Sequence, residues 1–272
     1  MYHGNSFSFF LKFFFPKSKL FFNIRHSLPN YKFENIKNLI SIYISKIFSK
    51  YTNCCVYNSL TSKQTHEHIG YGGNSIILRN GFYFEKKNRN KKPFFIKDES
   101  LIIGIVSRFH QIKGHEVFLQ ALKKLKQKKF TVIFIGKGTG SNKFKEFVKS
   151  YNLNTKFIYI DEVFYPKNYT ASMDLIINAS YSESMPNIIG ESFSQEIFAI
   201  ASDVGDTHLY FSDKRFLFKS GSPTDLAKKI ELFINLNENE KNLIIRNNKK
   251  LMIKNFNMKK CSQEYYSLYL NG

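Results

Sequence analysis

Apolar and polar positions along this chain follow two periods, one typical of strands and one typical of helices. Short apolar runs predict strands at residues 20–24, 54–58, 75–79, 101–107, 130–135, 157–160, 175–179 and 198–202. Apolar residues three or four positions apart predict helices at residues 31–50, 59–68, 115–129, 142–151, 166–172, 187–196, 223–236, 238–255 and 258–270. From residue 101 onward strands and helices alternate, which predicts an α/β fold with a parallel sheet and right-handed crossovers.

The first 22 residues are dominated by Phe and Lys. Their pattern predicts a short helix over residues 6–15 that ends before Pro16. A cationic, aromatic helix can lie on an anionic bilayer surface with its Lys heads at the lipid phosphates. It can equally be a core helix that other parts of the chain cover, and the sequence leaves both interpretations open.

The composition is that of a globular protein with an unusually basic surface. Of 272 residues, 43% are hydrophobic, and the formal net charge is +20. Only six of the 41 basic residues are Arg, and Lys, Asn, Ile and Phe are all abundant, as in proteins from low-GC genomes. A nucleic-acid-binding protein would be expected to use more Arg for bidentate contacts. No apolar run reaches 18 residues, no signal peptide is expected, and three Cys without paired spacing favour a reducing cytoplasm.

The stretch YSESMPNIIGE at residues 181–191 carries the first candidate site. Glu183 falls in the loop after the strand at 175–179, and Glu191 falls on the following helix, which Ser182 or Ser184 is expected to cap. Carboxylates at the carboxyl end of a parallel strand suit the hydroxyl groups of sugars and riboses. An ordinary acidic first turn, which the helix dipole favours, is the alternative.

A second candidate site follows the strand at 101–107. In SRFHQIKG, Arg108 and Lys113 lie in one strand-end loop, where both can converge on a diphosphate. Two solvated surface charges are the alternative. The next strand ends in GKGTG, where Gly136 and Gly138 predict a turn first and a phosphate contact second, since no Walker motif is present.

Together these motifs resemble those of the family 4 retaining glycosyltransferases, which have the GT-B fold. The resemblance rests on Arg108, Lys113 and Gly114, on Gly136 and Gly138, and on Asp174, Ser180, Glu183, Pro186, Asn187 and Glu191. It implies that Arg108 and Lys113 bind the diphosphate of a nucleotide-sugar, that Gly136 and Gly138 lie beside its base, and that Glu191 binds its ribose with Asn187 nearby. Glu183 would face the donor sugar.

The resemblance is looser near the amino terminus. His3, in MYHGN, resembles a His in a strand-end loop that approaches the donor sugar. Where the family has Gly and Pro, this chain has Glu196 and Phe198, and where Glu is common it has Leu209. Residues 1–97 are expected to form a partial acceptor-side domain with a linker at 88–97. Residues 98–255 would form the nucleotide-sugar-binding domain, with the last helix, 256–272, packing back on the first.

The resemblance implies a hexosyltransferase-type enzyme that moves a sugar from a nucleoside diphosphate sugar to a glycan or lipid-linked acceptor with retention of configuration. It would act in surface polysaccharide synthesis, in the cytoplasm or at the inner face of the membrane, without a metal or other cofactor and without nucleic acid. One alternative is a truncated, non-catalytic nucleotide-binding remnant, which the missing opening strands favour. Another is a basic nucleic-acid-binding protein, although no motif of that class is present.

Overall fold

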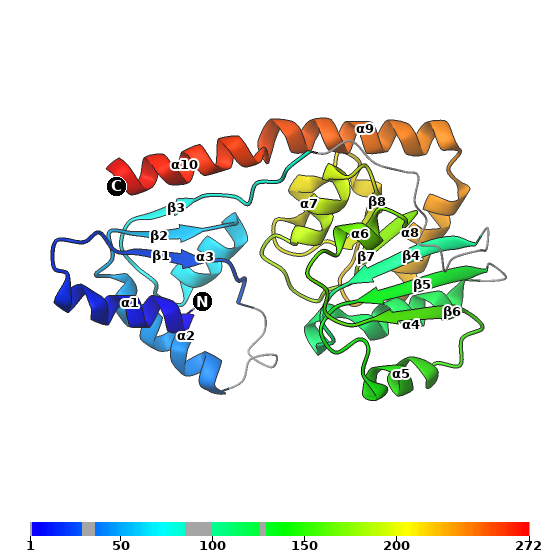
Figure 1. The fold of residues 1–272 in the computed structure, drawn as a ribbon, viewed down its shortest axis with the longest axis horizontal. Coiled ribbons are helices and arrows are strands. Elements are labelled where there is room, and N and C mark those ends of the chain that lie inside the picture. Colours follow the sequence, from blue (N-terminus) through cyan, green and yellow to red (C-terminus); the bar gives the residue numbers. More distant parts are fainter. Residues whose placement is uncertain (1, 29–35, 85–99, 126–128, 272) are drawn as a thin grey trace. The chain divides into compact units, whose positions relative to one another are not determined.

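The computed structural model describes residues 2–28, 36–84, 100–125 and 129–271, which fold into two compact units (Figure 1). Unit 1 consists of Met1–Gly81, Ser182–Met185 and Phe256–Gly272, and unit 2 consists of Phe82–Tyr181 and Pro186–Asn255. Each unit contains a parallel sheet, so the α/β class expected from the alternating pattern is confirmed.

Unit 1 is built on a three-stranded parallel sheet in the order β1-β2-β3. Its elements are α1 (Tyr2–Phe14), β1 (Phe21–Ile24), α2 (Ile36–Ser49), β2 (Cys54–Tyr57), α3 (Leu60–His68), β3 (Ser75–Ile77) and α10 (Met258–Asn271). The central strand β2 is buried along its whole length, and its two faces carry separate apolar clusters. Ser59 caps α3 by accepting a hydrogen bond from the backbone N–H of Ser62, as its position before the helix predicts.

The carboxyl-terminal helix α10 contributes to the core of unit 1. Tyr265 and Leu268 pack against Val56 and its neighbours in the sheet. Arg25, which follows β1, donates hydrogen bonds to the Tyr265 hydroxyl and to Asn80 Oδ1, both at 3.3 Å. The guanidinium of Arg25 therefore joins a strand end, the chain segment after β3 and the last helix.

Unit 2 contains a six-stranded parallel sheet. Its strands are β4 (Leu101–Val106), β5 (Phe130–Ile135), β6 (Lys156–Ile160), β7 (Leu175–Asn178), β8 (Phe198–Ser202) and β9 (Leu217–Phe218). Its α-helices are α4 (His115–Lys124), α5 (Asn142–Lys149), α6 (Lys167–Thr170), α7 (Asn187–Ser194), α8 (Pro223–Asn235) and α9 (Glu238–Asn255). The strand order is β6-β5-β4-β7-β8-β9. The chain grows outward from β4 to β6 on one side and from β7 to β9 on the other, so the topological switch point lies between β4 and β7.

Burial explains why the strands of unit 2 are continuous apolar runs. All residues of β5, β7 and β8 are buried, as expected for a parallel sheet that helices cover on both faces (Figure 1). Phe134 of β5 and Phe144 of α5 meet edge to face, with ring centroids 5.0 Å apart.

The structure differs from the sequence predictions at three places, and a fourth prediction falls outside the described residues. Helix α1 begins at Tyr2 rather than near residue 6, so it includes His3. The N-cap of α7 is Pro186, which makes no side-chain capping bond, so neither Ser182 nor Ser184 caps this helix. Strand β9 was not predicted because two residues are too few to show a period. The linker expected at 88–97 lies outside the described residues.

Candidate functional site

The loops that follow β4 and β7 flank the topological switch point of unit 2. In open parallel sheets, ligands bind outside the carboxyl ends of the strands at such a point. The loop after β4 contains Arg108 and Lys113, and the helix after β7 carries Glu191. The strand order of unit 2 thus places these three predicted residues on the two elements that border the expected ligand crevice.

Backbone contacts at Ile112 and Gly114 hold the second half of the loop after β4 against the end of β7. Gly114 has φ 62°, in the left-handed region, and a Cβ there would overlap the carbonyl oxygen of Ala179 at the end of β7. The backbone N–H of Tyr181 donates to the carbonyl of Ile112 at 2.8 Å. These contacts join the loop after β4 to the end of β7.

The two cationic side chains of this loop differ in their surroundings. Arg108 is exposed, and within the described part of the chain its guanidinium makes no hydrogen bond or ion pair. Lys113 is half-buried beside Gly114, at the amino end of α4, whose N-cap provides no side-chain bond. A guanidinium and an ammonium near a helix amino terminus form a favourable environment for an anion.

His115 is a buried residue of this loop region that the sequence did not single out. Its Nε2 lies 3.2 Å from the Ser107 hydroxyl, and burial lowers its pKa to about 4. The ring packs among Phe109 and Phe144, so it is neutral at physiological pH and supports the loop by packing. The contact with Phe144 of α5 joins separate segments of the chain, which a local pattern cannot show.

The GKGTG segment forms a turn, as predicted. Gly136 has φ 146°, and a Cβ there would overlap the backbone at Ser107, so a larger residue would push apart the ends of β4 and β5. The N–H of Gly138 donates to the Asp161 carboxylate after β6, at 2.7 Å. That N–H is therefore occupied, and the adjacent negative charge disfavours a phosphate at this position. Any contact between this turn and a nucleotide-sugar would use other atoms.

Glu191 has the environment of a ligand-binding carboxylate. Its side chain reaches the surface, yet the surrounding protein partly desolvates the carboxylate and raises its pKa above the usual value. Its carboxylate forms no hydrogen bond or ion pair within the residues described. On the neighbouring position of α7, Gly190 accommodates the ring of Phe82, which a Cβ would overlap. Asn187 is exposed in the first turn of the same helix.

Glu183 belongs to unit 1, within the segment Ser182–Met185. The flanking serines hold this segment in that unit. The Ser184 hydroxyl donates to the carbonyl of Arg25 at 3.2 Å and accepts from Asn58 Nδ2 at 3.1 Å, and the Ser182 hydroxyl lies 3.0 Å from that of Ser27. Glu183 is therefore attached to the carboxyl ends of β1 and β2, whereas Glu191 belongs to unit 2.

Two histidines of unit 1 differ from expectation. His3 lies in the first turn of α1 rather than in a strand-end loop, and its exposed ring hydrogen-bonds through Nδ1 to the Ser41 hydroxyl at 2.7 Å. From the sequence, His66 and His68, two residues apart with no third ligand nearby, are expected on the surface of a helix rather than at a metal site. His66 is instead fully buried, with Nε2 2.7 Å from the Tyr2 hydroxyl, and burial lowers its pKa to about 4.

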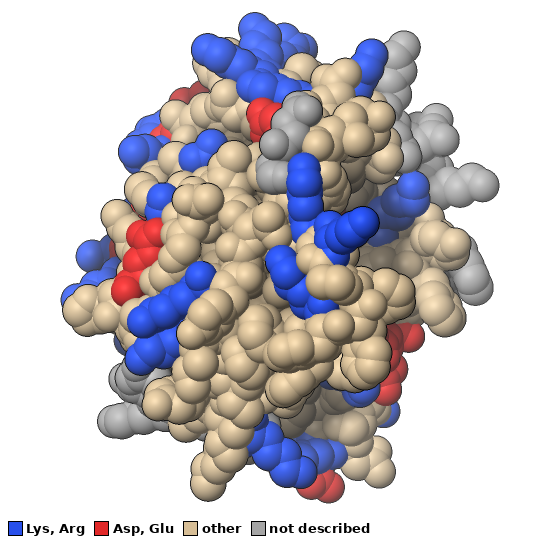
Figure 2. Space-filling model, turned by 90° about the vertical axis from the view of Figure 1, so that its left-hand side faces the viewer, with Lys and Arg blue, Asp and Glu red and all other residues tan. Residues whose placement is uncertain are grey.

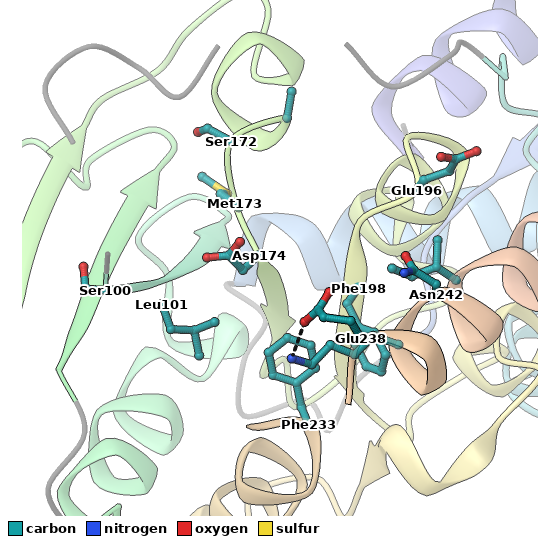
Figure 3. Close-up of a pocket in the computed structure, with 13 residues that line it drawn as sticks. Ser100, Leu101, Ser172, Met173, Asp174, Glu196, Phe198, Phe233, Glu238 and Asn242 are labelled. Carbon is teal, nitrogen blue, oxygen red and sulfur yellow. Dashed lines mark hydrogen bonds and ion pairs between the residues drawn. The ribbon is translucent and has the colours of Figure 1, made fainter. Parts of the chain in front are cut away.

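A pocket of about 420 Å³ lies at the other end of the unit 2 strands, beside the amino ends of β4, β7 and β8 (Figure 3). Asp174 there accepts a hydrogen bond from the backbone N–H of Ile102 at 2.9 Å. Glu238 pairs with Lys241 at 3.0 Å, and Glu196 pairs with a lysine of α9. Because its acidic groups already have protein partners, this pocket is a weaker candidate for a ligand site than the carboxyl ends of β4 and β7.

Residues 86–251 match the family described as glycosyl transferases group 1. The O-antigen biosynthesis glycosyltransferase WclY of Escherichia coli is 25% identical over 145 residues, which cover 53% of this chain and 40% of WclY. The capsular polysaccharide biosynthesis glycosyltransferase CapM of Staphylococcus aureus is 22% identical over 245 residues, which cover 88% of this chain and 64% of CapM. The chain thus spans less than two thirds of the length of either relative.

Solved structures share the fold over almost the whole chain. Anabaena HepE in complex with UDP and glucose superimposes with a TM-score of 0.83 at 17% identity, covering 100% of this chain and 76% of HepE. The sucrose-phosphate synthase of Thermosynechococcus elongatus gives a TM-score of 0.81 at 15% identity, covering 97% of this chain and 71% of the synthase. These likenesses confirm the expected α/β fold of the GT-B type.

Proposed function

The chain belongs to the glycosyl transferases group 1 family, and on this premise we propose that it moves a sugar from a nucleoside diphosphate sugar to a glycan or lipid-linked acceptor. The proposal includes family 4 membership, a hexose donor and retention of anomeric configuration. The names of WclY and CapM, which refer to O-antigen and capsular polysaccharide biosynthesis, support a role in surface polysaccharide synthesis. HepE was solved with UDP and glucose, which supports a uridine diphosphate sugar as the first donor to test.

The observation that carries the proposal is the arrangement at the switch point of unit 2. A free guanidinium and a half-buried ammonium lie in the loop after β4, and an unpaired carboxylate lies on the helix after β7. The cations suit a diphosphate, and the carboxylate suits the hydroxyl groups of a ribose. A nucleoside diphosphate presents both groups.

In the proposed reaction, Arg108 and Lys113 stabilise the negative charge that develops on the departing diphosphate. Removing one such donor typically raises the barrier by about 3–4 kcal/mol. Glu191 accepts hydrogen bonds from the ribose, with Asn187 in the same helical turn. Lys113 and Arg108 make a metal unnecessary for charge neutralisation, so we expect no cofactor.

The remaining site residues have less direct support. Gly136 and Gly138 would shape the turn beside the base, and Glu183 and His3 would act on the donor sugar. The ring of His3 is exposed, and the Ser41 hydroxyl lies 2.7 Å from its Nδ1 and 3.4 Å from its Nε2. The proposed location is the cytoplasm, at the inner face of the membrane, where lipid-linked acceptors are accessible.

Calorimetric titration of the chain with UDP, GDP and ADP tests the proposal. One nucleotide should bind in the micromolar range, and Arg108→Ala and Glu191→Ala should each abolish measurable binding. Arg246→Ala and Glu231→Ala are matched controls, because both residues are exposed on other helices of unit 2. Absence of binding by folded protein, or equal loss in the controls, would remove the donor site.

Turnover separates the enzyme from the non-catalytic alternative. With the sugar nucleotide of the base that binds, and membrane lipids or glycans as acceptor, the active chain should release the nucleoside diphosphate and attach the sugar with its configuration retained. Tight nucleotide binding without any transfer, across the acceptors tried, would favour a nucleotide-binding remnant.

A further inference from the structure

Helices α1 and α2 pack side by side in unit 1 through aromatic rings (Figure 1). Phe9 stacks on Phe48 with ring centroids 4.0 Å apart and an interplanar angle of 9°. Phe10 meets Phe48 edge to face at 5.4 Å, and Tyr51 lies 6.0 Å from Phe9. The two helices therefore present one continuous surface.

Helix α2 exposes its apolar stripe and buries its small polar residues. Its buried residues are Ser41, Ile42, Ser45 and Ser49. Its exposed stripe consists of Ile36, Ile40, Tyr43 and Ile47, which are 74%, 54%, 61% and 44% exposed. These positions recur at the spacing of one helical face. A helix that served only to cover the sheet would be expected to turn this face inward.

Helix α1 shows the same arrangement. Its buried residues are Tyr2 and Asn5. Phe7, Phe10, Leu11 and Phe14 lie on one face at helical spacing and are 64%, 52%, 41% and 79% exposed, and Phe13 and Phe15 extend this apolar surface. We call the exposed apolar residues of both helices, from Phe7 to Phe15 and from Ile36 to Ile47, the α1–α2 face. An apolar surface of this extent marks an interaction site.

Within the described residues of the two helices and of the segments directly beside them, the charged side chains are basic. Lysines lie within or directly beside the two helices at positions 12, 17, 19, 37, 46 and 50. The described segments 2–28 and 36–66 contain no Asp or Glu. Figure 2 shows that basic side chains also predominate over acidic ones on the face that it displays. The ammonium of Lys46 lies 5.5 Å from the centre of the Tyr43 ring, so charge and apolar surface adjoin directly.

We propose that the α1–α2 face binds the surface of an anionic phospholipid bilayer. Aromatic and aliphatic side chains would enter the boundary between headgroups and acyl chains, and the surrounding Lys ammonium groups would contact lipid phosphates. Such a helix lies in the plane of the membrane. In the described residues no helix is both long and apolar enough to cross a bilayer, which fits surface attachment.

Charge complementarity is the reason to favour a bilayer over a second copy of the chain. Two copies meeting through this face would bring two sets of Lys ammonium groups together, and the described segments 2–28 and 36–66 contain no carboxylate side chain to neutralise them. An anionic surface supplies the opposite charge and accepts the apolar stripe at the same time. The proposal does not depend on sugar transfer, because binding to vesicles requires no donor.

Co-sedimentation with phosphatidylglycerol–phosphatidylcholine vesicles tests the proposal. Binding should exceed that to pure phosphatidylcholine vesicles and should weaken at high salt. The double variant Lys12→Gln with Lys37→Gln should weaken partitioning of the chain onto the vesicles by about 25-fold, because each lost charge should weaken it by about fivefold. Phe14→Ser with Ile40→Ser should weaken it by at least about tenfold. All four residues are at least partly exposed, so the variants should keep the native circular dichroism.

The matched controls are Lys143→Gln and Leu243→Ser, which change an exposed Lys and an exposed Leu of unit 2. They should bind as the unchanged chain does. Failure of the folded chain to bind anionic vesicles would overturn the proposal, as would equal losses in the controls. Sedimentation velocity tests the other occupant, a second copy of the chain. If the chain forms dimers, does not bind vesicles, and becomes monomeric in the double variant Phe14→Ser with Ile40→Ser, the face would be assigned to a second copy.

Discussion

Replacing Gly114 by Ala tests whether the close approach of the loop after β4 to the end of β7 builds the donor site. Gly114 has φ 62°, and a Cβ would overlap the carbonyl oxygen of Ala179. The left-handed conformation costs a non-glycine residue about 1–2 kcal/mol. The overlap adds about 1–3 kcal/mol, because the atom that must move is backbone and cannot rotate away. We therefore expect a total loss of about 2–5 kcal/mol in the free energy of unfolding.

Gly221→Ala separates the two contributions. Gly221 also has a positive φ, 73°, but its added Cβ would meet the side-chain ring of Tyr181 at 3.1 Å, which can shift slightly. This variant should lose only the conformational term, about 1–2 kcal/mol. Urea unfolding followed by circular dichroism measures both variants under one condition.

Nucleotide affinity provides the functional readout. Gly114→Ala should weaken binding of the preferred nucleotide, because Lys113 moves with the displaced backbone, whereas Gly221→Ala should not change it. If Gly114→Ala costs no more stability than Gly221→Ala and leaves affinity intact, then the contact with β7 neither strains the loop nor positions the cation.

Three further predictions concern carboxylates and thiols. Because desolvation raises the pKa of Glu191, its ionised form opposes folding, so Glu191→Gln should raise the urea midpoint at pH 7. That gain should vanish once the pH falls below the ordinary carboxyl pKa of about 4.3, and a gain that persists there would contradict the assignment. Glu196 has φ 59°, a left-handed conformation that Gly adopts without strain, and it pairs with Lys249 at 2.7 Å. Both Glu196→Gly and Glu196→Ala lose that pair, so in urea unfolding Glu196→Gly should be more stable than Glu196→Ala by about 1–2 kcal/mol. Equal stabilities of the two variants would show that the backbone is unstrained. Cys55 is buried and its pKa is raised to about 11, so with Cys54, also buried, it should react with a disulfide reagent only after unfolding in urea; rapid reaction of folded protein would disprove this.

The motifs in the sequence lie beside the switch point of unit 2 in the structure, whereas several other residues make contacts that the sequence did not predict. Arg25 follows a strand, and its guanidinium donates a hydrogen bond to Tyr265 of α10. Ser184 was expected to cap α7, and it instead bonds to Asn58 and the carbonyl of Arg25 in unit 1. His115 and Asp161 support the site and were not recognised. Each difference depends on a partner far away in the sequence, which local pattern cannot show.

The sequence by itself determined the positions of the strands and helices, because the apolar periods of 2 and 3.6 residues are properties of neighbouring side chains. It also determined which residue types stand at the carboxyl ends of β4 and β7. Only the tertiary structure decided the strand order that creates a switch point between them. Only it decided that α2 buries three of its serines while it exposes Ile36, Ile40 and Ile47. Both outcomes follow from close packing between distant segments, where backbone approach and buried contacts outweigh the preference of any single stretch of chain.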